Sequence, residues 1–472
     1  MRVAIALLAA GYFALLVSNT LFSATGPDTS GYLAEARLIA SGRTSVAIEP
    51  LVKAGLPASM SWLFTPYGFR PAGDGTMVPT YPVGMPLHLA AAAAIGGWKV
   101  APFLVAPLAA VASLFLFAAL AREFGLGRGW AMAGAALLGA YPVFINMSLQ
   151  PMSDVPATAW TLAATLCALR SRLSWRWAAA CGVAFAVAVA VRPSNVILAV
   201  PLALALELRP ARLAVAAAGA LPFAAALMWY HDTLYGSPFK TGYGSAGEIL
   251  SFAGMPPCLS SHATAIAGML TPLIAAGLFV SFDRLLGRWQ RAVLLTWMAV
   301  FLLFYSYYSY CPDPAATRFL LPALPPLIVG FLRVVSRVRI VAVAAILLVL
   351  GCEVVKIGRM HTLHYDEWES IYPRTVEWVE REVPPDGVVL AAIVSGTFYC
   401  QAGRIPLRWD QLDPRNAAIV RAAPGLDGPW YAVVSEVEGG EAALRARIPG
   451  AWRVVGKLRD VTLWRLDRRA PG

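Results

Sequence analysis

Hydrophobic residues gather in eleven runs along this chain, and charged residues are confined almost wholly to the segments between them. Apart from Glu353 and Lys356 in the last run, no run contains Asp, Glu, Lys, Arg or His. A helix needs about 20 apolar residues to cross a bilayer, with about 17 as the lower limit. The pattern therefore predicts a polytopic α-helical membrane protein with about eleven spans. The runs are residues 3–23, 101–120, 130–147, 155–169, 177–191, 194–206, 213–230, 264–282, 292–309, 319–332 and 340–357.

The composition supports a membrane protein and argues against two kinds of site. Of the 472 residues, 58% are hydrophobic and only 14% are charged, whereas soluble domains carry about 25% charged residues. The six cysteines form no CxxC pair and show no metal-ligand spacing, so a zinc or thiol-redox centre has no support. Cys258 and Cys311 fall on predicted outer loops, where the two cysteines could either form a disulfide or remain as two free thiols.

Basic residues lie in every second connection between the runs. These connections and the N-terminus carry fourteen basic and three acidic residues, which accounts for the whole net charge of +11. Such sorting is typical of cytoplasmic loops and not of a nucleic-acid-binding patch, so we predict no nucleic-acid partner. The acids are Glu123, Glu207 and Asp283, and the basic residues are Arg2, Arg122, Arg128, Arg170, Arg172, Arg176, Arg209, Arg212, Arg284, Arg288, Arg291, Arg333, Arg337 and Arg339.

The charge sorting also predicts the orientation of the chain in a bacterial inner membrane. The N-terminus is expected in the cytoplasm, with residues 24–100 and the C-terminal segment outside. One alternative makes residues 3–23 a cleaved signal peptide. Because Arg2 is the only charge before this run and the run is long, we favour a retained membrane anchor.

The first outer loop, residues 24–100, contains two predicted helices. Residues 87–95 are apolar, include His88 and are too short to cross a bilayer, so we expect an interfacial helix lying along the membrane. If this segment crossed instead, the sidedness of every later loop would invert. Residues 29–40 have the period of an amphipathic helix, with one face formed by Tyr32, Leu33, Ala36 and Ile39.

From residue 361 onward the composition changes, because acids and bases mix and no further span is present. We predict a transmembrane domain over residues 1–360 and a small extracytoplasmic α/β domain over residues 361–472. This segment contains no phosphate-binding glycine loop, which favours a lid or support over a catalytic domain. The predicted helices are 374–382 and 440–448, and the predicted strands are 388–393, 430–434, 452–455 and 461–466.

Charged side chains crowd where the runs meet the outer loops. Transporters usually place such groups within the spans, at membrane depth. Acids and guanidinium groups at the membrane surface instead suit a reaction on a lipid phosphate, because the phosphate lies at headgroup height. The candidates are Asp28, Asp154, Arg192, Lys240, Asp313 and Arg318.

These groups can be assigned to the transfer of a sugar from a lipid phosphate, which needs a base and a phosphate clamp. Asp28 fits the base, although it could instead form an Asx-turn. Asp154 fits a group that orients the acceptor or holds a metal ion, or it caps the following span. Arg192, Lys240 and Arg318 fit the clamp, although Arg192 could simply anchor a helix end and Lys240 could be a solvated loop charge.

Four short motifs resemble the GT-C glycosyltransferases, most closely the protein mannosyltransferase and lipid A aminoarabinose transferase branch (family 39-like). The resemblance covers about residues 1–335 and, more loosely, the rest. The motifs are an acid with a small helix after the first run (Asp28, Tyr32, Ala36, Gly42), YPVGMP at 81–86, SDVP at 153–156 and RFLLPALP at 318–325.

The resemblance implies an inverting transferase with a polyprenyl-phosphate sugar donor. The family's catalytic acid corresponds to Asp28, its second-loop acid to Asp154, and the arginine near the donor phosphate to Arg318. Pro27 stands where family members often carry a second acid, which makes a tightly bound metal less expected. The chain has no MIR-type domain, so a protein acceptor is not favoured over a glycolipid or a cell-wall glycan.

The sequence therefore predicts sugar transfer from a polyprenyl phosphate to a glycolipid, glycan or protein acceptor at the outer membrane face. Membrane lipid is an expected partner, no cofactor is certain, and a divalent cation remains open. The alternatives are a lipid-linked saccharide flippase or transporter and a non-catalytic subunit of an envelope complex. Further candidates for contact with substrate are Tyr32, Tyr81, His88 and Tyr243.

Overall fold

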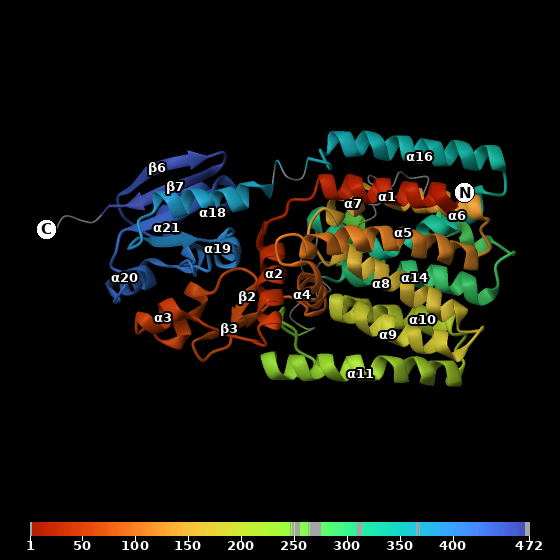
Figure 1. Ribbon diagram of the computed structural model, residues 1–472, viewed down its shortest axis with the longest axis horizontal. Helices are drawn as coiled ribbons and strands as arrows, with labels where there is room; N and C mark the ends of the chain where they lie inside the picture. Colours follow the sequence, from red (N-terminus) through yellow and green to blue (C-terminus); the bar gives the residue numbers. More distant parts are fainter. Residues whose placement is uncertain are drawn as a thin grey trace.

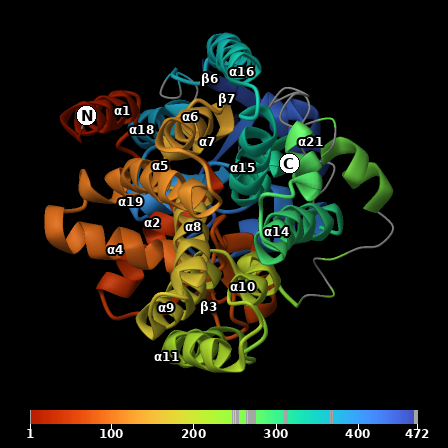
Figure 2. The same ribbon diagram turned by 90° about the vertical axis from the view of Figure 1, so that its right-hand side faces the viewer.

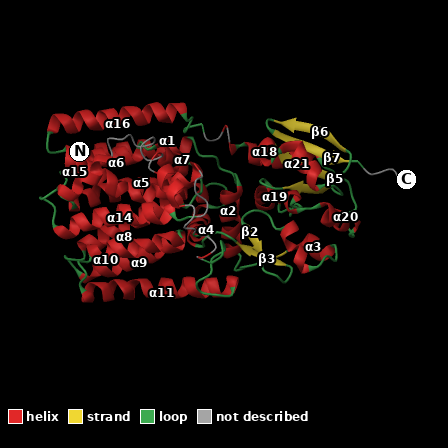
Figure 3. Ribbon diagram, turned by 180° about the vertical axis from the view of Figure 1, so that it is seen from behind, coloured by secondary structure: helices red, strands yellow, loops and turns green. Residues whose placement is uncertain are grey.

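The computed structural model shows an elongated molecule, with a helical bundle in one half and all of the described strands in the other (Figures 1 and 3). It describes residues 2–467 apart from 246, 248–249, 251–254, 263, 265–274, 309–313, 365–366 and 368. Asp313 and Cys311 therefore lie outside the described residues, and Cys258 is a buried free cysteine in the structure.

The bundle consists of helices that coincide with the predicted apolar runs, except that run 264–282 lies largely outside the described residues. Its 3-10 segments are η3 (Pro193–Leu198), η4 (Ala275–Phe282) and η5 (Pro314–Ala323). Its α-helices are α1 (Arg2–Ser18), α5 (Val105–Glu123), α6 (Arg128–Gly139), α7 (Pro142–Ser148), α8 (Asp154–Arg170), α9 (Trp175–Val191), α10 (Ala199–Ala205), α11 (Pro210–Tyr235), α14 (Arg288–Ser306), α15 (Leu324–Val335) and α16 (Arg339–Arg359).

Among the described residues, five helices are long and apolar enough to cross a membrane, and a bent pair brings the number to six. The count of eleven spans stays a prediction. Run 130–147 is not one straight helix, because α6 and α7 meet at 68°. The bend lies just before Pro142, which disfavours helical geometry in the preceding residue and cannot donate a backbone hydrogen bond.

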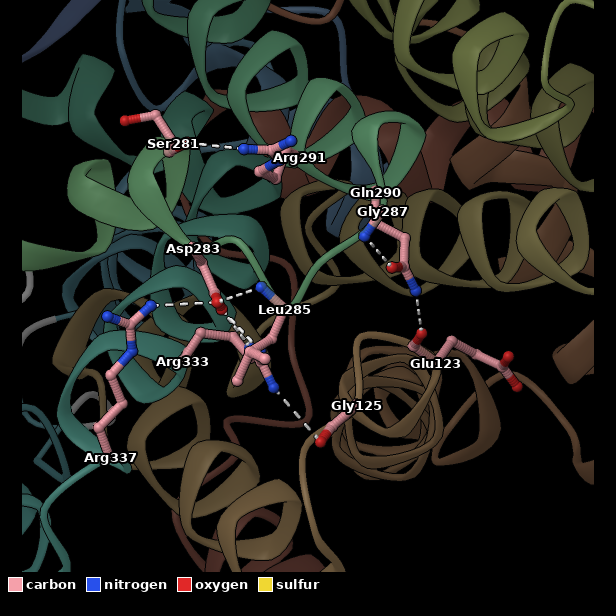
Figure 4. A network of polar contacts seen from close by, with 10 residues as sticks. All are labelled: Glu123, Gly125, Ser281, Asp283, Leu285, Gly287, Gln290, Arg291, Arg333 and Arg337. Carbon is pink, nitrogen blue, oxygen red and sulfur yellow. Dashed lines mark hydrogen bonds and ion pairs between the residues drawn. The ribbon is translucent and has the colours of Figure 1, made fainter.

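Two acids of the predicted cytoplasmic connections are paired with arginines of other such connections. Glu123 binds Arg170 and Arg172, and Asp283 binds Arg333 at 2.6 Å and Arg337 at 3.0 Å. Figure 4 shows Asp283 with Arg333 and Arg337, and also the Gln290 side-chain amide, which donates to the backbone carbonyl of Glu123. The connections that carry the positive charge therefore lie at one end of the bundle; the side of the membrane that this end faces remains a prediction.

Two helices of the first loop run across the other end of the bundle (Figures 1 and 2). The crosswise course of α4 (Gly84–Gly96) is the one expected for an interfacial helix. The prediction that α2 (Pro27–Ala40) is amphipathic was wrong, since residues 29–36 are all buried. The reason is that α2 packs against α4 and also against a helix of the C-terminal segment.

The rest of the first loop forms a small three-stranded antiparallel sheet and short helical turns. The sheet has the order β1-β3-β2. Its elements are β1 (Val46–Ala47), α3 (Glu49–Lys53), η1 (Ala58–Phe64), β2 (Phe69–Pro71) and β3 (Thr76–Pro79), and η2 (Ala101–Leu104) follows α4.

The C-terminal segment forms a four-stranded sheet of order β4-β5-β7-β6, in which only β4 and β5 are parallel. The four predicted strands and both predicted helices are confirmed, and α19 and α20 were not predicted. The elements are α18 (Ile371–Glu382), β4 (Val388–Ala391), α19 (Ser395–Ala402), η6 (Trp409–Gln411), α20 (Pro414–Ala422), β5 (Trp430–Ser435), η7 (Glu436–Glu438), α21 (Gly440–Arg447), β6 (Trp452–Leu458) and β7 (Val461–Leu466).

One hydrophobic core joins the first loop to the C-terminal sheet. It combines Ile48, Leu51, Phe64 and Phe69 of the loop with Leu390, Trp409, Trp430 and Trp452 of the C-terminal segment. The predicted boundary at residue 360 therefore separates segments that share a core. We call these two segments together the outer layer, because they cover one end of the bundle (Figure 1).

Glu35 is a buried acid on α2 with only 1% of its surface exposed. The Tyr230 hydroxyl donates to its Oε1 at 2.8 Å, and its Oε2 has no hydrogen-bond partner among the described residues. Burial raises the pKa of Glu35 to about 8. The carboxyl group is therefore protonated in the folded protein at neutral pH.

We expect Glu35 to make the folded protein less stable as the pH rises from about 5 to about 8. The unfolded chain loses the Glu35 proton near its ordinary pKa, whereas the folded protein holds it until about pH 8. Stability is therefore lost over this interval, by an amount on the order of a few kcal/mol. Thermal unfolding in detergent at pH 5 and pH 8 measures it, and Glu35→Gln should narrow the difference. The exposed Glu49→Gln is the control, and equal narrowing by both variants would contradict the assignment.

Candidate active site

Asp28 lies in the first turn of α2, directly after Pro27. Proline suits this first helical position, and the helix N-terminus favours a negative charge there. The Tyr81 hydroxyl donates to Asp28 Oδ1 at 2.7 Å, and Arg318 Nη2 donates to Asp28 Oδ2 at 2.7 Å. The carboxylate is thus held between a loop tyrosine and an arginine 290 residues away.

A second arginine pairs with a second acid beside the first. Arg192 follows the last residue of α9, and its Nη2 donates to Asp154 Oδ1 at 2.7 Å. Arg192 Nε and the Tyr32 hydroxyl both donate to Ser153 Oγ, at 3.1 and 3.0 Å. Two arginines and two acids, all from different parts of the chain, therefore form one cluster.

Phe319 joins the two arginines. The guanidinium carbons of Arg192 and Arg318 lie 4.8 and 5.2 Å from the centre of its ring. An aromatic face attracts cations, and this attraction offsets part of the repulsion between two like charges. Arg192 Nη1 and Arg318 Nε are buried donors without a hydrogen-bond partner among the described residues. Such donors match the oxygens of a phosphate.

The cluster opens into a cavity of about 790 Å³ between the bundle and the outer layer. Asp28, Tyr32, Tyr81, Arg192, Tyr243 and Arg318 line one part of the cavity, and Trp62, Tyr67, Arg408 and Gln411 of the outer layer line another. The rings of Tyr32 and Tyr81 lie 4.9 Å apart, and those of Tyr81 and Tyr243 lie 6.1 Å apart.

A second cavity of about 400 Å³ also has Asp28 and Arg318 in its wall. Its other lining residues include Asn146, Glu369 and Tyr372. Burial raises the pKa of Glu369 to about 7. The Asp28–Arg318 ion pair therefore lies in the wall of both cavities. A reaction between two substrates needs such an arrangement, with one substrate on each side of the reacting groups.

Several solved structures of other proteins are similar to the structure of this chain. No protein-family model and no curated protein matches the chain. ArnT from Cupriavidus metallidurans, solved with undecaprenyl phosphate, is similar with a TM-score of 0.60 and 13% identity, over 98% of this chain and 97% of ArnT. The oligosaccharyltransferase AglB from Archaeoglobus fulgidus, solved with an inhibitory peptide and dolichol-phosphate, is similar with a TM-score of 0.56 and 12% identity, over 99% of this chain and 74% of AglB. The arabinofuranosyltransferase AftD from Mycobacteria is similar with a TM-score of 0.54 and 16% identity, over 98% of this chain and 41% of AftD.

This chain has the fold of ArnT, AglB and AftD. At these identities the likeness is one of fold. The family 39 branch named from the sequence motifs stays a prediction.

Six of the ten candidates named from the sequence line the larger cavity: Asp28, Tyr32, Tyr81, Arg192, Tyr243 and Arg318. Asp154 lines neither cavity, since its side chain is 0% exposed and lies behind Arg192. This placement favours a role in holding Arg192 over direct contact with an acceptor. Both acids bind guanidinium groups, and no cluster of three or more His, Cys, Asp or Glu side chains in the described ranges could hold a metal.

Lys240 and His88 lie outside the larger cavity. Lys240 precedes the segment 241–244, which does line it. His88 Nε2 accepts from Trp160 Nε1 at 3.0 Å, and its Nδ1 contacts the Gly84 carbonyl at 2.6 Å. His88 therefore links α4 to α8, because its side of α4 faces the bundle and not the cavity.

Two groups of residues in the site were not predicted from the sequence. Ser153 and Phe319 lie within the SDVP and RFLLPALP motifs, but no role was predicted for either residue. The outer-layer residues Trp62, Tyr67, Arg408 and Gln411 gave no signal in the sequence, because only the shared core brings their segments to the cavity.

Proposed function

We propose that this protein is a membrane glycosyltransferase that moves a sugar from a polyprenyl-phosphate donor to an acceptor hydroxyl. The observation that carries the proposal is the Asp28–Arg318 pair beside Arg192 in the wall of one cavity. Two proteins of similar fold, ArnT and AglB, have been solved with a polyprenyl-type phosphate, which supports a lipid-linked donor.

Asp28 is the general base in this proposal. Its carboxylate takes the proton of the acceptor hydroxyl, and the acceptor oxygen bonds to the anomeric carbon of the donor sugar. The bond from that carbon to the phosphate oxygen breaks, and the phosphate leaves with the electron pair. A single displacement inverts the configuration of the sugar.

Arg318 and Arg192 stabilise the leaving phosphate. Both line the cavity and both carry a buried N–H without a partner among the described residues. Charge-assisted bonds from guanidinium groups to phosphate are strong and directional. Because Arg318 also binds Asp28 Oδ2, a donor phosphate that draws Arg318 away frees this oxygen to accept a proton.

Tyr81 positions the base. Its hydroxyl stays bonded to Asp28 Oδ1, on the side of the carboxylate away from the Arg318 contact. Asp154 and Ser153 position Arg192 in the same way. The two acids therefore have different roles, one in proton transfer and one in orientation.

The charge distribution supports a site at the outer face of a bacterial inner membrane. The N-terminus and the start of α16 lie at the end of the bundle away from α2 (Figure 1). That end carries the arginine-rich connections, which are typical of the cytoplasmic side. The cavity beside α2 would then face the extracytoplasmic space.

Consumption of a donor by the purified protein tests the proposal. The full chain in nanodiscs is mixed with a radiolabelled polyprenyl-phosphate sugar and a glycan extract from the native membrane. We expect release of polyprenyl phosphate together with label in the extract. Movement of intact donor across a liposome membrane without release of polyprenyl phosphate would support the flippase alternative and overturn the proposal.

We expect Arg318→Ala to lower kcat/KM for the donor at least about tenfold, because a charge-assisted hydrogen bond is lost. Lys240→Ala is the matched control, since this cation of the outer side does not line the cavity, and its effect should stay within about twofold. Initial rates at varied donor concentration measure both. Equal effects of the two substitutions would remove Arg318 from the clamp.

A further inference from the structure

We propose that Trp62, Tyr67 and Gln411 form a subsite for a neutral glycan acceptor in the outer-layer wall of the larger cavity. The inference rests on the proposed function and adds the class of acceptor. All three residues line the cavity. They come from the first loop and from the C-terminal segment, not from the bundle.

Two large aromatic rings are left partly open to this cavity. Trp62 is 54% exposed and Tyr67 is 36% exposed. Exposed apolar surface inside a cavity marks a binding region, because water contact is costly for an aromatic face. Tryptophan and tyrosine pair a rigid apolar face with a polar edge. A sugar ring offers the same combination of an apolar C–H face and hydroxyl edges.

The segment that carries these rings is held rigidly. Arg408, which is buried, donates through Nη1 to the Thr65 carbonyl at 3.2 Å, and its backbone N–H donates to the Leu63 carbonyl at 2.6 Å. Its guanidinium carbon lies 3.9 Å from the centre of the Tyr67 ring. The Ser395 hydroxyl accepts from the Tyr67 backbone N–H at 3.1 Å. The C-terminal segment therefore fixes the first-loop wall of the cavity.

The three side chains of the proposed subsite are uncharged, and the charge of Arg408 beside the Tyr67 ring is compensated. Arg408 Nε binds Asp410 Oδ1 at 2.7 Å, so its charge is compensated. Arg70 also lines the cavity, and its contact with the uncharged Gly242 carbonyl at 3.1 Å leaves its positive charge in place. Gln411 adds an uncharged side chain with donor and acceptor groups, which match sugar hydroxyls. The uncharged rings and amide of these three side chains fit a neutral glycan.

The position of the wall assigns it to the acceptor. The phosphate-binding residues Arg192 and Arg318 come from the bundle, where the lipid tail of a donor would lie. Trp62 and Gln411 come from the outer layer, which reaches away from the bundle (Figure 1). A glycan that enters from the aqueous side would contact these residues and present its terminal hydroxyl to Asp28.

The test separates acceptor use from donor use in nanodiscs that contain the full chain. Initial rates are measured against neutral glycan extract at saturating donor, and against donor at saturating glycan. We expect Trp62→Ala to raise the acceptor KM at least tenfold and to leave the donor KM and the saturated turnover within twofold. Trp62→Phe, which keeps a ring, should recover most of the acceptor affinity. The control is Trp175→Ala, because Trp175 is 66% exposed and lies at the start of α9, away from the cavity.

The possible results distinguish failure of the subsite from failure of the proposed function. An unchanged acceptor KM in Trp62→Ala, with normal turnover, overturns the subsite and leaves the transferase proposal intact. No donor consumption by the unsubstituted protein overturns the proposed function itself. Transfer to acidic glycans or peptides in preference to neutral glycans also overturns the subsite. Should Trp62→Ala lower the unfolding temperature, Gln411→Ala gives the same acceptor test from an exposed position.

Discussion

Asp28→Asn is expected to reduce sugar transfer by about 10²- to 10⁴-fold, the range typical for loss of a general base. Asparagine has nearly the same shape as aspartate and can still accept the Tyr81 hydrogen bond, but it cannot take a proton. The measurement is the rate of polyprenyl phosphate release at saturating donor and acceptor. Protein abundance and unfolding temperature should stay close to those of the unsubstituted protein.

The control for this substitution is Asp386→Asn, an exposed acid in the turn before β4 that lines neither cavity. It should leave the rate unchanged. Turnover retained by Asp28→Asn would assign the proton transfer to another group. Glu369 would then be the first candidate, since it lines the smaller cavity with Asp28 and burial raises its pKa to about 7.

Asp154→Ala is expected to destabilise the protein by about 3–5 kcal/mol, because it leaves Arg192 as a buried charge without its acid. Asp154 is fully buried, and its partner is held by one 2.7 Å contact and by Ser153. Thermal and denaturant unfolding in detergent measure the loss. Donor use should fall as well, since Arg192 is no longer oriented toward the cavity.

The double substitution Asp154→Ala with Arg192→Met distinguishes stability from function. Replacing a buried ion pair by apolar side chains is often neutral for stability, so most of the unfolding temperature should return. Transfer should stay low, because the clamp has lost one of its arginines. Activity that returned together with stability would contradict a role for Arg192 in binding the donor phosphate.

The helical framework could be predicted because its signals are local. Apolar runs, proline positions and alternating loop charge located the bundle elements and the strands of the C-terminal sheet. Asp28 and Arg318 could also be predicted as candidates, since Asp28 closely follows the first apolar run and Arg318 directly precedes the run 319–332. The Asp413–Pro414 pair, a helix-start signal, could have revealed α20.

What could not be predicted depends on contacts between distant segments. The shared core of Phe64, Trp409 and Trp430 carries no local signal, so the outer layer was read as two separate parts. The rotation of α4 about its axis places His88 against Trp160. This rotation could not be predicted, because a short apolar helix has no polar face that indicates which side is buried. The burial of Asp154 likewise depends on Arg192, which lies 38 residues away.

The most direct test of the account is the position of undecaprenyl phosphate in a structure of the protein in a lipid nanodisc. The account predicts phosphate oxygens about 2.7–3.2 Å from guanidinium nitrogens of Arg318 or Arg192. It also predicts that the Asp28–Arg318 contact, 2.7 Å in the present structure, lengthens when the phosphate binds. A phosphate bound elsewhere, with that contact still closed, would contradict the central claim that these residues form the donor site.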